Sequence, residues 1–313
     1  MSHNIEHLGK GAIRDTPDDR DFQAASSPLF AEALQAVDWS QPFSWEEPPN
    51  EDQNGSSSCV GQGWSYYHWQ LKRRDYSRRY LYAPIHSPGG GAEIRMGGLR
   101  IVTVGQATRD EVPDPNPETE SAMINMTGIT DAQGASDREL DSYVLTKNID
   151  SYAAAIKAFR GVVGGLCGTN QGWADLTNPR PPIDSDTGVI WGHCLYFFGY
   201  HMHDGQKCLI AKSSWGTAGN TTVHHIKENY FTSGQMFNPW TLIPKDSMKL
   251  INDNGTIYIV GGKNKKIGLA DPGLLTALTD IEDVQTGSTS GIPQVHIIKQ
   301  LPPSPQGFEV VNN

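Results

Sequence analysis

The chain has 313 residues and a net charge of −10, and 37% of its residues are hydrophobic. This length fits one large domain with an appended part, and the apolar share is enough for a packed core. The acidic excess argues against a nucleic-acid partner, because phosphates are bound mainly by Lys and Arg. No apolar run approaches the ~20 residues that a bilayer crossing needs, so we expect no membrane span.

Residues 1–35 are polar and rich in Asp and Arg, and we interpret them as an N-terminal arm with a short helix near residues 28–37. No secretory signal is visible at its start, which predicts a cytoplasmic location. The four cysteines are too few for a disulfide scaffold and lack the paired short spacings of a zinc site. We therefore expect neither a metal nor another cofactor.

The segment after the arm leads into a strong helix signal. Small polar residues at 54–58 precede apolar and aromatic side chains that recur at helical spacing, at 60, 64, 67 and 71. The serines directly before this pattern are suitable N-caps. Cys59 therefore falls in the first turn of a predicted helix, where unpaired N–H groups and the helix dipole favour a thiolate.

Beyond this helix, loops rich in Gly and Pro alternate with short regular segments. Residues 92–104 are compatible with a second helix, and residues 110–140 predict a long surface loop. The pattern then predicts a helix at 151–160, a strand at 162–166 and another long loop at 167–188.

Residues 189–216 predict a buried hairpin. His193 opens the apolar aromatic run of its first strand, and the second strand at 208–211 leads into Ser213 and Trp215. Taken alone, the segment is compatible with a core hairpin whose histidine is merely hydrogen-bonded. It is equally compatible with a catalytic base held beside its orienting partner.

Other residues of this region have ordinary structural interpretations. Cys194 and Cys208 are predicted to be buried thiols that could face each other across the hairpin. Four histidines are predicted to lie in turns or on strand surfaces: His201, His203, His224 and His225. Further strands that close the sheet are predicted at 223–226, 230–231 and 240–243.

The composition changes near residue 246, and we interpret residues 246–313 as a small appended module with an extended tail. Apolar segments at 255–260 and 267–269 predict a β-hairpin, and residues 271–272 predict the start of a short helix. The hairpin is a possible docking element for a protein assembly partner.

Cys59 and His193 together fit the pattern of a cysteine nucleophile with its base. A thiolate attacks an acyl carbon, an imidazole pairs with it and later protonates the leaving group, and a third side chain holds the imidazole ring. Ser213 occupies that third position. An oxyanion donor is also required, and Gln53 can supply it together with the backbone N–H of Cys59.

These residues resemble the papain-like cysteine peptidases, as a divergent bacterial or phage-type member. Gln53 to Cys59 keeps the Gln-to-Cys spacing of the family's Gln-Gly-x-Cys-Gly-Ser-Cys-Trp motif, and Gly192-His193-Cys194 resembles its His-Ala strand entry. Lys212-Ser213-Ser214-Trp215-Gly216 resembles its Lys-Asn-Ser-Trp-Gly signature. His193 also follows the cysteine within the ~130–150 residues usual in the family.

The resemblance implies a two-lobed α+β fold, with a helical left lobe, a right lobe built as an antiparallel sheet or barrel, and a cleft that binds an extended peptide. The implied peptidase domain covers residues 36–245. Its implied catalytic residues are Cys59, His193, Ser213 and Gln53. Its implied substrate-binding residues are Gly89, Gly90, Gly91 and Trp215. The expected partner is a peptide or protein substrate.

The chain departs from the family pattern at three positions. Ser213 stands where the family has the Asn that orients the histidine, although a hydroxyl can still accept from or donate to the ring. Val60 replaces the usual Trp, and Ser56 replaces a disulfide cysteine, which fits a protein outside an oxidising compartment. No long inhibitory propeptide is visible, so we do not expect activity to wait for cleavage.

Three functions remain open at this point. The first is a cysteine endopeptidase that works through an acyl-enzyme on Cys59. The second is a catalytically weak or inactive papain-like scaffold that is virion-associated, as a structural component of a phage particle, or part of a surface assembly. The replacement at Ser213 and the module at 246–313 motivate it. The third is acyl transfer to an amine by the same residues.

Overall fold

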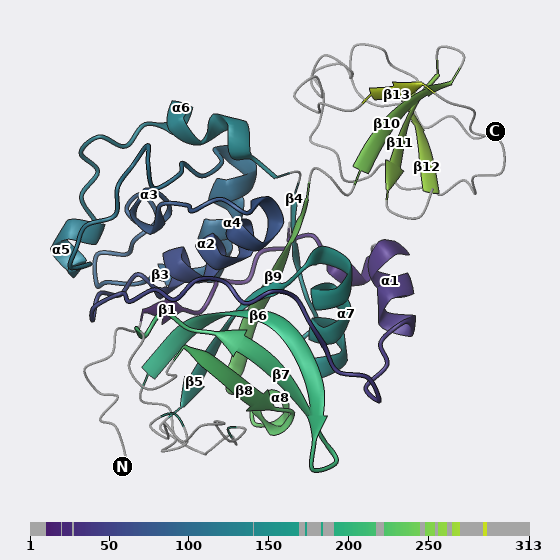
Figure 1. Ribbon diagram of the computed structural model, residues 1–313, viewed down its shortest axis with the longest axis horizontal. Coiled ribbons are helices and arrows are strands. Elements are labelled where there is room, and N and C mark those ends of the chain that lie inside the picture. The colour runs from purple at the N-terminus through teal and green to yellow at the C-terminus, as the bar shows by residue number, and fades with distance from the viewer. Residues whose placement is uncertain are drawn as a thin grey trace. The chain divides into compact units, whose positions relative to one another are not determined.

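The computed structural model describes the chain up to residue 244 with gaps, and beyond it the backbone of four strands (Figure 1). The described residues are 11–19, 21–26, 28–139, 141–168, 173, 183, 191–216, 222–244, 248–253, 256–261, 265–269 and 284–286. The chain divides into two compact units, Met1–Ile243 and Pro244–Asn313. In the described part, no helix is long and apolar enough to cross a bilayer.

The first unit has a helical lobe built around α2 (Cys59–Lys72), which is buried along almost its whole length and begins where the sequence predicts. Around it lie α3 (Arg78–Tyr82), α4 (Ile94–Thr103), α5 (Glu120–Met123), α6 (Asp131–Gly134) and the 3-10 turn η2 (Ala135–Asp137) (Figure 1). The second predicted helix is thus confirmed as α4. The predicted surface loop at 110–140 instead contains two short helices and a 3-10 turn.

Glycines allow α2 to approach its neighbours closely. A Cβ added to Gly63 would lie 3.0 Å from Sγ of Cys194, so this part of the helix rests directly on the sheet. A Cβ added to Gly97 of α4 would lie 2.2 Å from Cδ1 of the Trp64 indole. That indole is fixed, because its Nε1 donates a 2.8 Å hydrogen bond to the carbonyl of Ile94.

The second lobe is a seven-stranded sheet. Six strands run in the order β4 (Asp141–Val144), β9 (Met236–Ile243), β5 (Val162–Gly168), β6 (Trp191–His203), β7 (Gln206–Lys212) and β8 (Val223–Lys227), and β2 (Phe43–Ser44) pairs with β6. Every neighbouring pair is antiparallel. Among the described strands β4 and β8 do not pair with each other, so the sheet is open. The two-lobed α+β prediction is confirmed, and the barrel alternative is wrong.

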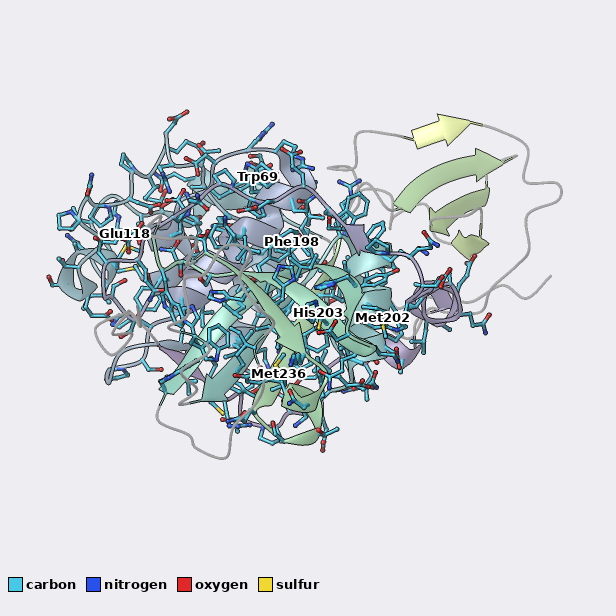
Figure 2. The ribbon with its side chains drawn as sticks, turned by 60° about the horizontal axis from the view of Figure 1, so that its bottom comes forward. Trp69, Glu118, Phe198, Met202, His203 and Met236 are labelled. Atoms are coloured by element: carbon cyan, nitrogen blue, oxygen red, sulfur yellow. The ribbon has the colours of Figure 1, made fainter. Side chains whose placement is uncertain are left out.

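Helices cover part of this sheet. The helix predicted at 151–160 is confirmed as α7 (Ile149–Phe159), which packs on β6 and β9, and α1 (Pro28–Gln35) packs on α7 and on the 3-10 turn η1 (Ala24–Ser26). Figure 2 shows Glu118 among the side chains of the helical lobe, and His203 and Met236 on the strands. α2 packs on β6, so the two lobes meet along these two elements.

The hairpin forms, but it is longer than the sequence indicates. His193 lies inside β6 rather than at its mouth. Cys194 is paired with Gly165 and Cys208 with His201, so the two thiols do not face each other. All four cysteines are nevertheless buried and free, as predicted for these two.

Three elements of this lobe differ from the sequence predictions. The strands β2 and β4 lie in segments for which no strand is predicted. Residues 230–231, predicted as a strand, belong to the short helix α8 (Asn229–Thr232). Two adjacent aromatic residues are too short a pattern to separate a helix from a strand by periodicity.

The second unit contains a four-stranded sheet in the order β12 (Lys265–Leu269), β11 (Thr256–Gly261), β10 (Met248–Asp253) and β13 (Val284–Thr286). The predicted hairpin is present as β11 and β12, which pair antiparallel. It belongs to a larger sheet, because β10 pairs with β11 and β13 pairs parallel with β10. The predicted helix start at 271–272 and the tail beyond residue 286 lie outside the described residues.

The contact between Gly97 and Trp64 gives a test of this packing. Gly97→Ala gains about 1 kcal/mol of helix propensity, but its Cβ would overlap an indole that cannot move away, and overpacking costs about 1–3 kcal/mol. We expect a lower thermal midpoint, measured by circular dichroism. Gly89→Ala is the matched control, since a Cβ there meets nothing within 4 Å. A raised midpoint for Gly97→Ala would contradict the packing.

Candidate active site

The structure brings Cys59 next to the strand that carries His193. Cys59 is the first residue of α2 and is fully buried. The backbone N–H of Cys194, the residue after His193, is hydrogen-bonded to the Cys59 thiol. Helix and strand therefore meet where the sequence predicts the nucleophile and the base.

Burial decides the protonation of Cys59 in this conformation. It raises the pKa of the thiol from 9.0 to about 12, against the opposing effect of backbone N–H groups that include those of Cys194 and Val60. The position of Cys59 at the start of the helix predicts a thiolate. In this conformation burial favours the neutral thiol, because the cost of desolvating a charge exceeds the gain from the helix terminus.

His193 is fully buried and stacks on Trp215, with ring centroids 4.4 Å apart and planes inclined by 24°. Trp215 in turn meets two further indoles, Trp173 at 5.7 Å and Trp191 at 6.0 Å, both near perpendicular. Trp215 thus packs directly on the ring of His193. A role of Trp215 in substrate binding remains a prediction.

The side chain of Ser213 has a hydrogen-bond partner that the sequence pattern did not indicate. Its Oγ lies 2.9 Å from Nε2 of His224, and both residues are buried. His224 was predicted to lie on a strand surface or in a turn, and this is wrong. It points inward with Ile226 of the same strand, and alternation with this apolar residue was the signal that could have shown it.

Gln53 connects the loop before α2 with the end of β7. Its backbone N–H donates to the carbonyl of Ser214 at 3.0 Å, and its Oε1 accepts from Oγ of Ser214 at 2.5 Å. Its Nε2 donates to the carbonyl of Ser56 at 2.5 Å, which occupies one of its two amide hydrogens. The side chain is buried and fixed, and its role as an oxyanion donor remains a prediction.

A segment of the N-terminal arm lies against this site. The N–H of Gly11 donates to the carbonyl of Gly192 at 3.1 Å, and its carbonyl accepts from the N–H of Ala92 at 2.9 Å. The strand β1 (Ala12–Ile13) continues alongside β3 (Ala92–Glu93) in parallel register. A peptide of this chain therefore runs between the residue before His193 and the segment after the glycine loop.

Gly11 also closes over the loop that precedes Cys59. A Cβ added to Gly11 would lie 2.3 Å from the carbonyl oxygen of Ser57, and one added to Gly91 would lie 2.2 Å from the carbonyl oxygen of Gly11. A Cβ added to Gly90 would lie 3.2 Å from Oγ of the same serine. A Cβ added to Gly89 would meet nothing within 4 Å. One of the three predicted substrate-binding glycines, Gly91, thus borders the arm, and Gly90 borders the loop before Cys59.

The arm is anchored beyond the site by a buried carboxylate. Asp15 accepts from the backbone N–H of Arg95 at 3.0 Å and from Nε1 of Trp240 at 2.7 Å. The side chain of Arg95 also pairs with Asp21 at 2.8 Å. Burial raises the pKa of Asp15, and the two hydrogen bonds act in the opposite direction.

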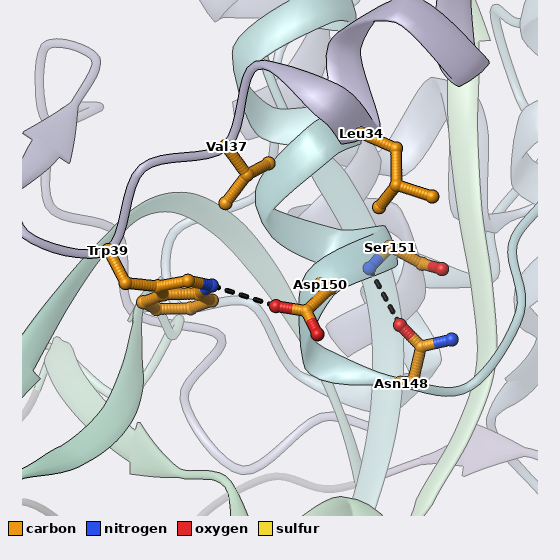
Figure 3. A pocket seen from close by; sticks show the side chains of 6 residues that line it. All are labelled: Leu34, Val37, Trp39, Asn148, Asp150 and Ser151. Carbon is orange, nitrogen blue, oxygen red and sulfur yellow. Dashed lines mark hydrogen bonds between the residues drawn. The ribbon is translucent and has the colours of Figure 1, made fainter.

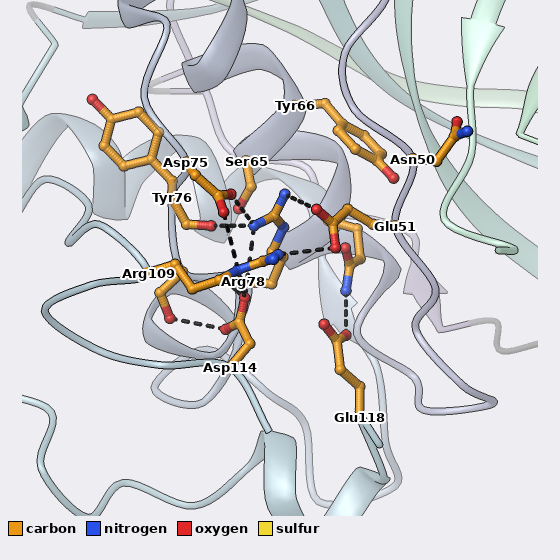
Figure 4. A network of polar contacts seen from close by, with 12 residues as sticks. Asn50, Glu51, Ser65, Tyr66, Asp75, Tyr76, Arg78, Arg109, Asp114 and Glu118 are labelled. Atoms are coloured by element: carbon orange, nitrogen blue, oxygen red, sulfur yellow. Dashed lines mark hydrogen bonds and ion pairs between the residues drawn. The ribbon is translucent and has the colours of Figure 1, made fainter. Parts of the chain in front are cut away.

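A buried polar network supports the loop that carries Gln53 (Figure 4). The guanidinium of Arg78, which is 2% exposed, pairs with Glu51 at 2.8 Å and with Asp75 at 2.5 Å. Arg109 pairs with the other oxygen of Glu51 at 2.9 Å. The carbonyl of Glu51 accepts from the N–H of Gly216 at 3.0 Å, so the network reaches the end of the Trp215 segment.

Glu118 lies at the inner edge of the same network. Nε2 of Gln62 in α2 donates to its carboxyl at 2.5 Å. Burial and, to a lesser extent, the negative charge of Asp114 raise the pKa of Glu118 to about 8. The carboxyl is therefore mostly protonated at neutral pH.

One hollow of about 400 Å³ lies elsewhere on the first unit (Figure 3). It is lined by Leu34, Val37, Trp39, Asn148, Asp150 and Ser151. Its polar groups are used by the fold, since Trp39 donates to Asp150 at 2.7 Å and Asn148 caps α7 through Ser151. None of its lining residues is a predicted site residue, so we do not assign it to the active site.

A two-lobed α+β fold with a cysteine at the start of the central helix and a histidine on the facing sheet defines the papain-like class. No protein-family model matches this chain, and a comparison with curated proteins finds no match. The fold, however, matches solved structures, and the neighbours named below are cysteine proteases or their precursors. The chain has the papain-like cysteine protease fold.

Three solved structures illustrate the likeness. Xylellain, a cysteine protease from Xylella fastidiosa, has a TM-score of 0.58 at 19% identity, covering 76% of this chain and 97% of that one. ProCathepsin B S9 from Trypanosoma congolense has a TM-score of 0.58 at 14% identity, covering 76% of this chain and 86% of that one. A recombinant stem bromelain precursor has a TM-score of 0.58 at 13% identity, covering 77% of this chain and 78% of that one.

The high pKa of Glu118 predicts how stability depends on pH. The unfolded carboxyl titrates near 4.5 and the folded one near 8, so between these values unfolding releases a proton. The stability that Glu118 contributes is complete below about pH 4.5 and is lost as the pH rises through about 8.

Glu118→Gln imitates the protonated acid and does not ionise. Relative to the unmodified chain, the thermal midpoint of this variant should be similar or lower at pH 5 and higher at pH 8.5. Calorimetry at both pH values measures the difference. An equal difference at the two pH values would contradict a protonated Glu118.

Proposed function

We propose that the chain is a cysteine peptidase that hydrolyses peptide bonds through Cys59 and His193. The position of Gly11 carries this proposal, because this extended segment donates a backbone hydrogen bond to the carbonyl of Gly192, the residue before His193, and accepts one from the N–H of Ala92. Backbone pairing of this kind binds extended peptides largely independently of their side chains. A substrate can use the same backbone groups.

In the proposed reaction, the Cys59 thiolate attacks the carbonyl carbon of the scissile bond. The N–H of Cys59 and Nε2 of Gln53 stabilise the oxyanion that forms. The His193 imidazolium gives its proton to the departing amine, which leaves an acyl-enzyme on Cys59. A water molecule then attacks the acyl carbon, His193 accepts its proton, and the thiolate is released together with the acid.

This conformation is proposed to be a resting state. Residues 11–13 occupy the place of a substrate, and the closed site keeps the Cys59 thiol protonated, with a pKa of about 12. From the sequence we expect activity without the removal of any inhibitory segment. The path of the arm supports the opposite view, that residues 11–13 must leave before a substrate can enter.

The alternative of an inactive scaffold is favoured by one observation, the complete burial of the Cys59 thiol. Failure of Cys59 to react with a peptidyl electrophile, even after displacement of the arm, would support it. An assembly partner for residues 246–313 and a virion location stay predictions. Acyl transfer would be separated from hydrolysis by product analysis with an added amine.

The nucleophile can be tested directly. Cys59→Ala should abolish both hydrolysis of a mixed peptide library and labelling by a peptidyl electrophile, because the reaction has no other route to the acyl-enzyme. Mass spectrometry of the peptides and of the labelled chain measures the two. Cys208→Ala is the matched control, a buried thiol opposite His201 that should leave both unchanged. Hydrolysis that persists in Cys59→Ala would overturn the mechanism.

The resting state can be tested with a single methyl group. Gly11→Ala places a Cβ against the carbonyl of Ser57 and should weaken docking of the arm. Each ~1.4 kcal/mol lost from docking raises the open population about tenfold, so we expect at least about a tenfold faster labelling of Cys59. Gly205→Ala, in the open turn between β6 and β7, should label at the original rate. A slower or unchanged rate in Gly11→Ala would reject an inhibitory arm.

A further inference from the structure

Glu120 joins two parts of the chain that lie far apart in sequence. It is the first residue of α5, and its Oε2 accepts from the backbone N–H of Ser57 at 2.5 Å. Its Oε1 accepts from the hydroxyl of Tyr82, the last residue of α3, at 2.7 Å. That hydroxyl in turn accepts from the backbone N–H of Gly91 at 2.9 Å. One half-buried carboxyl group thus connects the loop before Cys59 with the end of the glycine loop.

The direction of each of these hydrogen bonds follows from the groups involved. A backbone N–H can only donate, so Ser57 and Gly91 are the donors at the two ends. The Tyr82 hydroxyl accepts from Gly91, which leaves its single hydrogen for Glu120. Burial, followed by the hydrogen bond to Glu120, raises the pKa of Tyr82, so the hydroxyl keeps this hydrogen. The carboxyl of Glu120 is therefore the acceptor on which both paths end.

Ser57 and Gly91 are also the two residues between which Gly11 of the arm is packed. A Cβ added to Gly11 would lie 2.3 Å from the carbonyl oxygen of Ser57, and one added to Gly91 would lie 2.2 Å from the carbonyl oxygen of Gly11. A Cβ added to Gly90 would lie 3.9 Å from Oε1 of Glu120, so the glycine loop itself passes close to the carboxyl group. Glu120 therefore holds, directly or through one hydroxyl, the residues that contact this peptide segment.

We propose that Glu120 is a positioning residue for the extended peptide that binds beside Cys59. It sets the separation of two backbone edges, at Ser57 on one side and at Gly91 on the other, and the peptide lies between them. In the proposed resting state that peptide is the arm at Gly11, and on the proposed function a substrate takes the same place. The kinetic part of this inference rests on the proposed function, whereas the hold on the arm is independent of catalysis and can be measured separately.

Hydrogen exchange tests the hold on the arm. The N–H groups of Gly11 and Ala92 make the two backbone hydrogen bonds of the arm at this place. Tyr82→Phe leaves the buried N–H of Gly91 without its acceptor, which disfavours the docked arrangement, so we expect exchange at Gly11 and Ala92 to become about tenfold faster. Tyr152→Phe is the matched control, because it removes a buried hydroxyl that has no hydrogen-bond partner among the described residues. It should leave both exchange rates unchanged.

Labelling of Cys59 by two reagents separates the positioning of a peptide from a general loss of stability. Iodoacetamide carries no peptide and reports how often the site is open, whereas a peptidyl electrophile must also bind between the two edges. Opening of the site changes both rates alike, and so does the loss of the Glu120 charge near the thiol. The ratio of the peptidyl rate to the iodoacetamide rate therefore reports the binding of the peptide.

We expect this ratio to fall about tenfold in Tyr82→Phe and in Glu120→Gln, in which an amide NH₂ replaces one of the two accepting oxygens. Tyr152→Phe should keep the original ratio. A loss of stability alone would raise both labelling rates together and leave the ratio as it was. A ratio within about twofold of the unmodified chain in Tyr82→Phe and Glu120→Gln would overturn the proposal.

The exchange measurement distinguishes this inference from the peptidase proposal. If the peptidyl electrophile never labels Cys59 but exchange at Gly11 and Ala92 responds as expected, the peptidase proposal fails and the positioning of the arm stands. Unchanged exchange at these two residues in both variants would reject the positioning role. Glu120→Gln carries both measurements if Tyr82→Phe does not fold, because an amide has nearly the shape of a carboxylate.

Discussion

The contact between the start of α2 and the strand β6 determines the rest of this structure. The absence of a side chain at Gly63 lets the helix rest on Cys194, and the N–H of Cys194 reaches the Cys59 thiol. Side chains alternate along a strand, so the residue before Cys194 points to the other face, where Trp215 stacks on His193. This close approach thus places the start of α2 against the strand that carries His193.

The loop with Gln53 is held by charge rather than by covalent links. Glu51 is clamped by Arg78 and Arg109, while its carbonyl binds Gly216. Breaking a buried ion pair by removing one partner typically costs about 3–5 kcal/mol, because the remaining charge is left uncompensated. In the same loop, Oγ of Ser56 and Oγ of Ser58 are hydrogen-bonded at 2.8 Å. The four cysteines form no disulfide, so these polar contacts hold the loop.

The sequence predicted what depends on local pattern and spacing. The helix at Cys59 follows from its period of apolar residues, and the hairpin around His193 follows from two apolar runs and a turn. The partner of Ser213 could not be predicted in the same way. His224 reaches it only because β8 pairs with β7 in one particular register, which is a long-range property. The same holds for Gly11, since nothing in residues 11–13 indicates that they pair with β3.

The arm and the thiol are linked by electrostatics. A helix N-terminus stabilises a negative charge by up to about 2 kcal/mol, and complete burial outweighs this gain, as the pKa of Cys59 near 12 shows. The same cysteine would become a better nucleophile once water reaches it, because desolvation is the largest cause of its raised pKa. The resting state proposed above follows from this balance: residues 11–13 are held at Gly11 by hydrogen bonds to both lobes, and on that proposal they leave before water reaches the thiol.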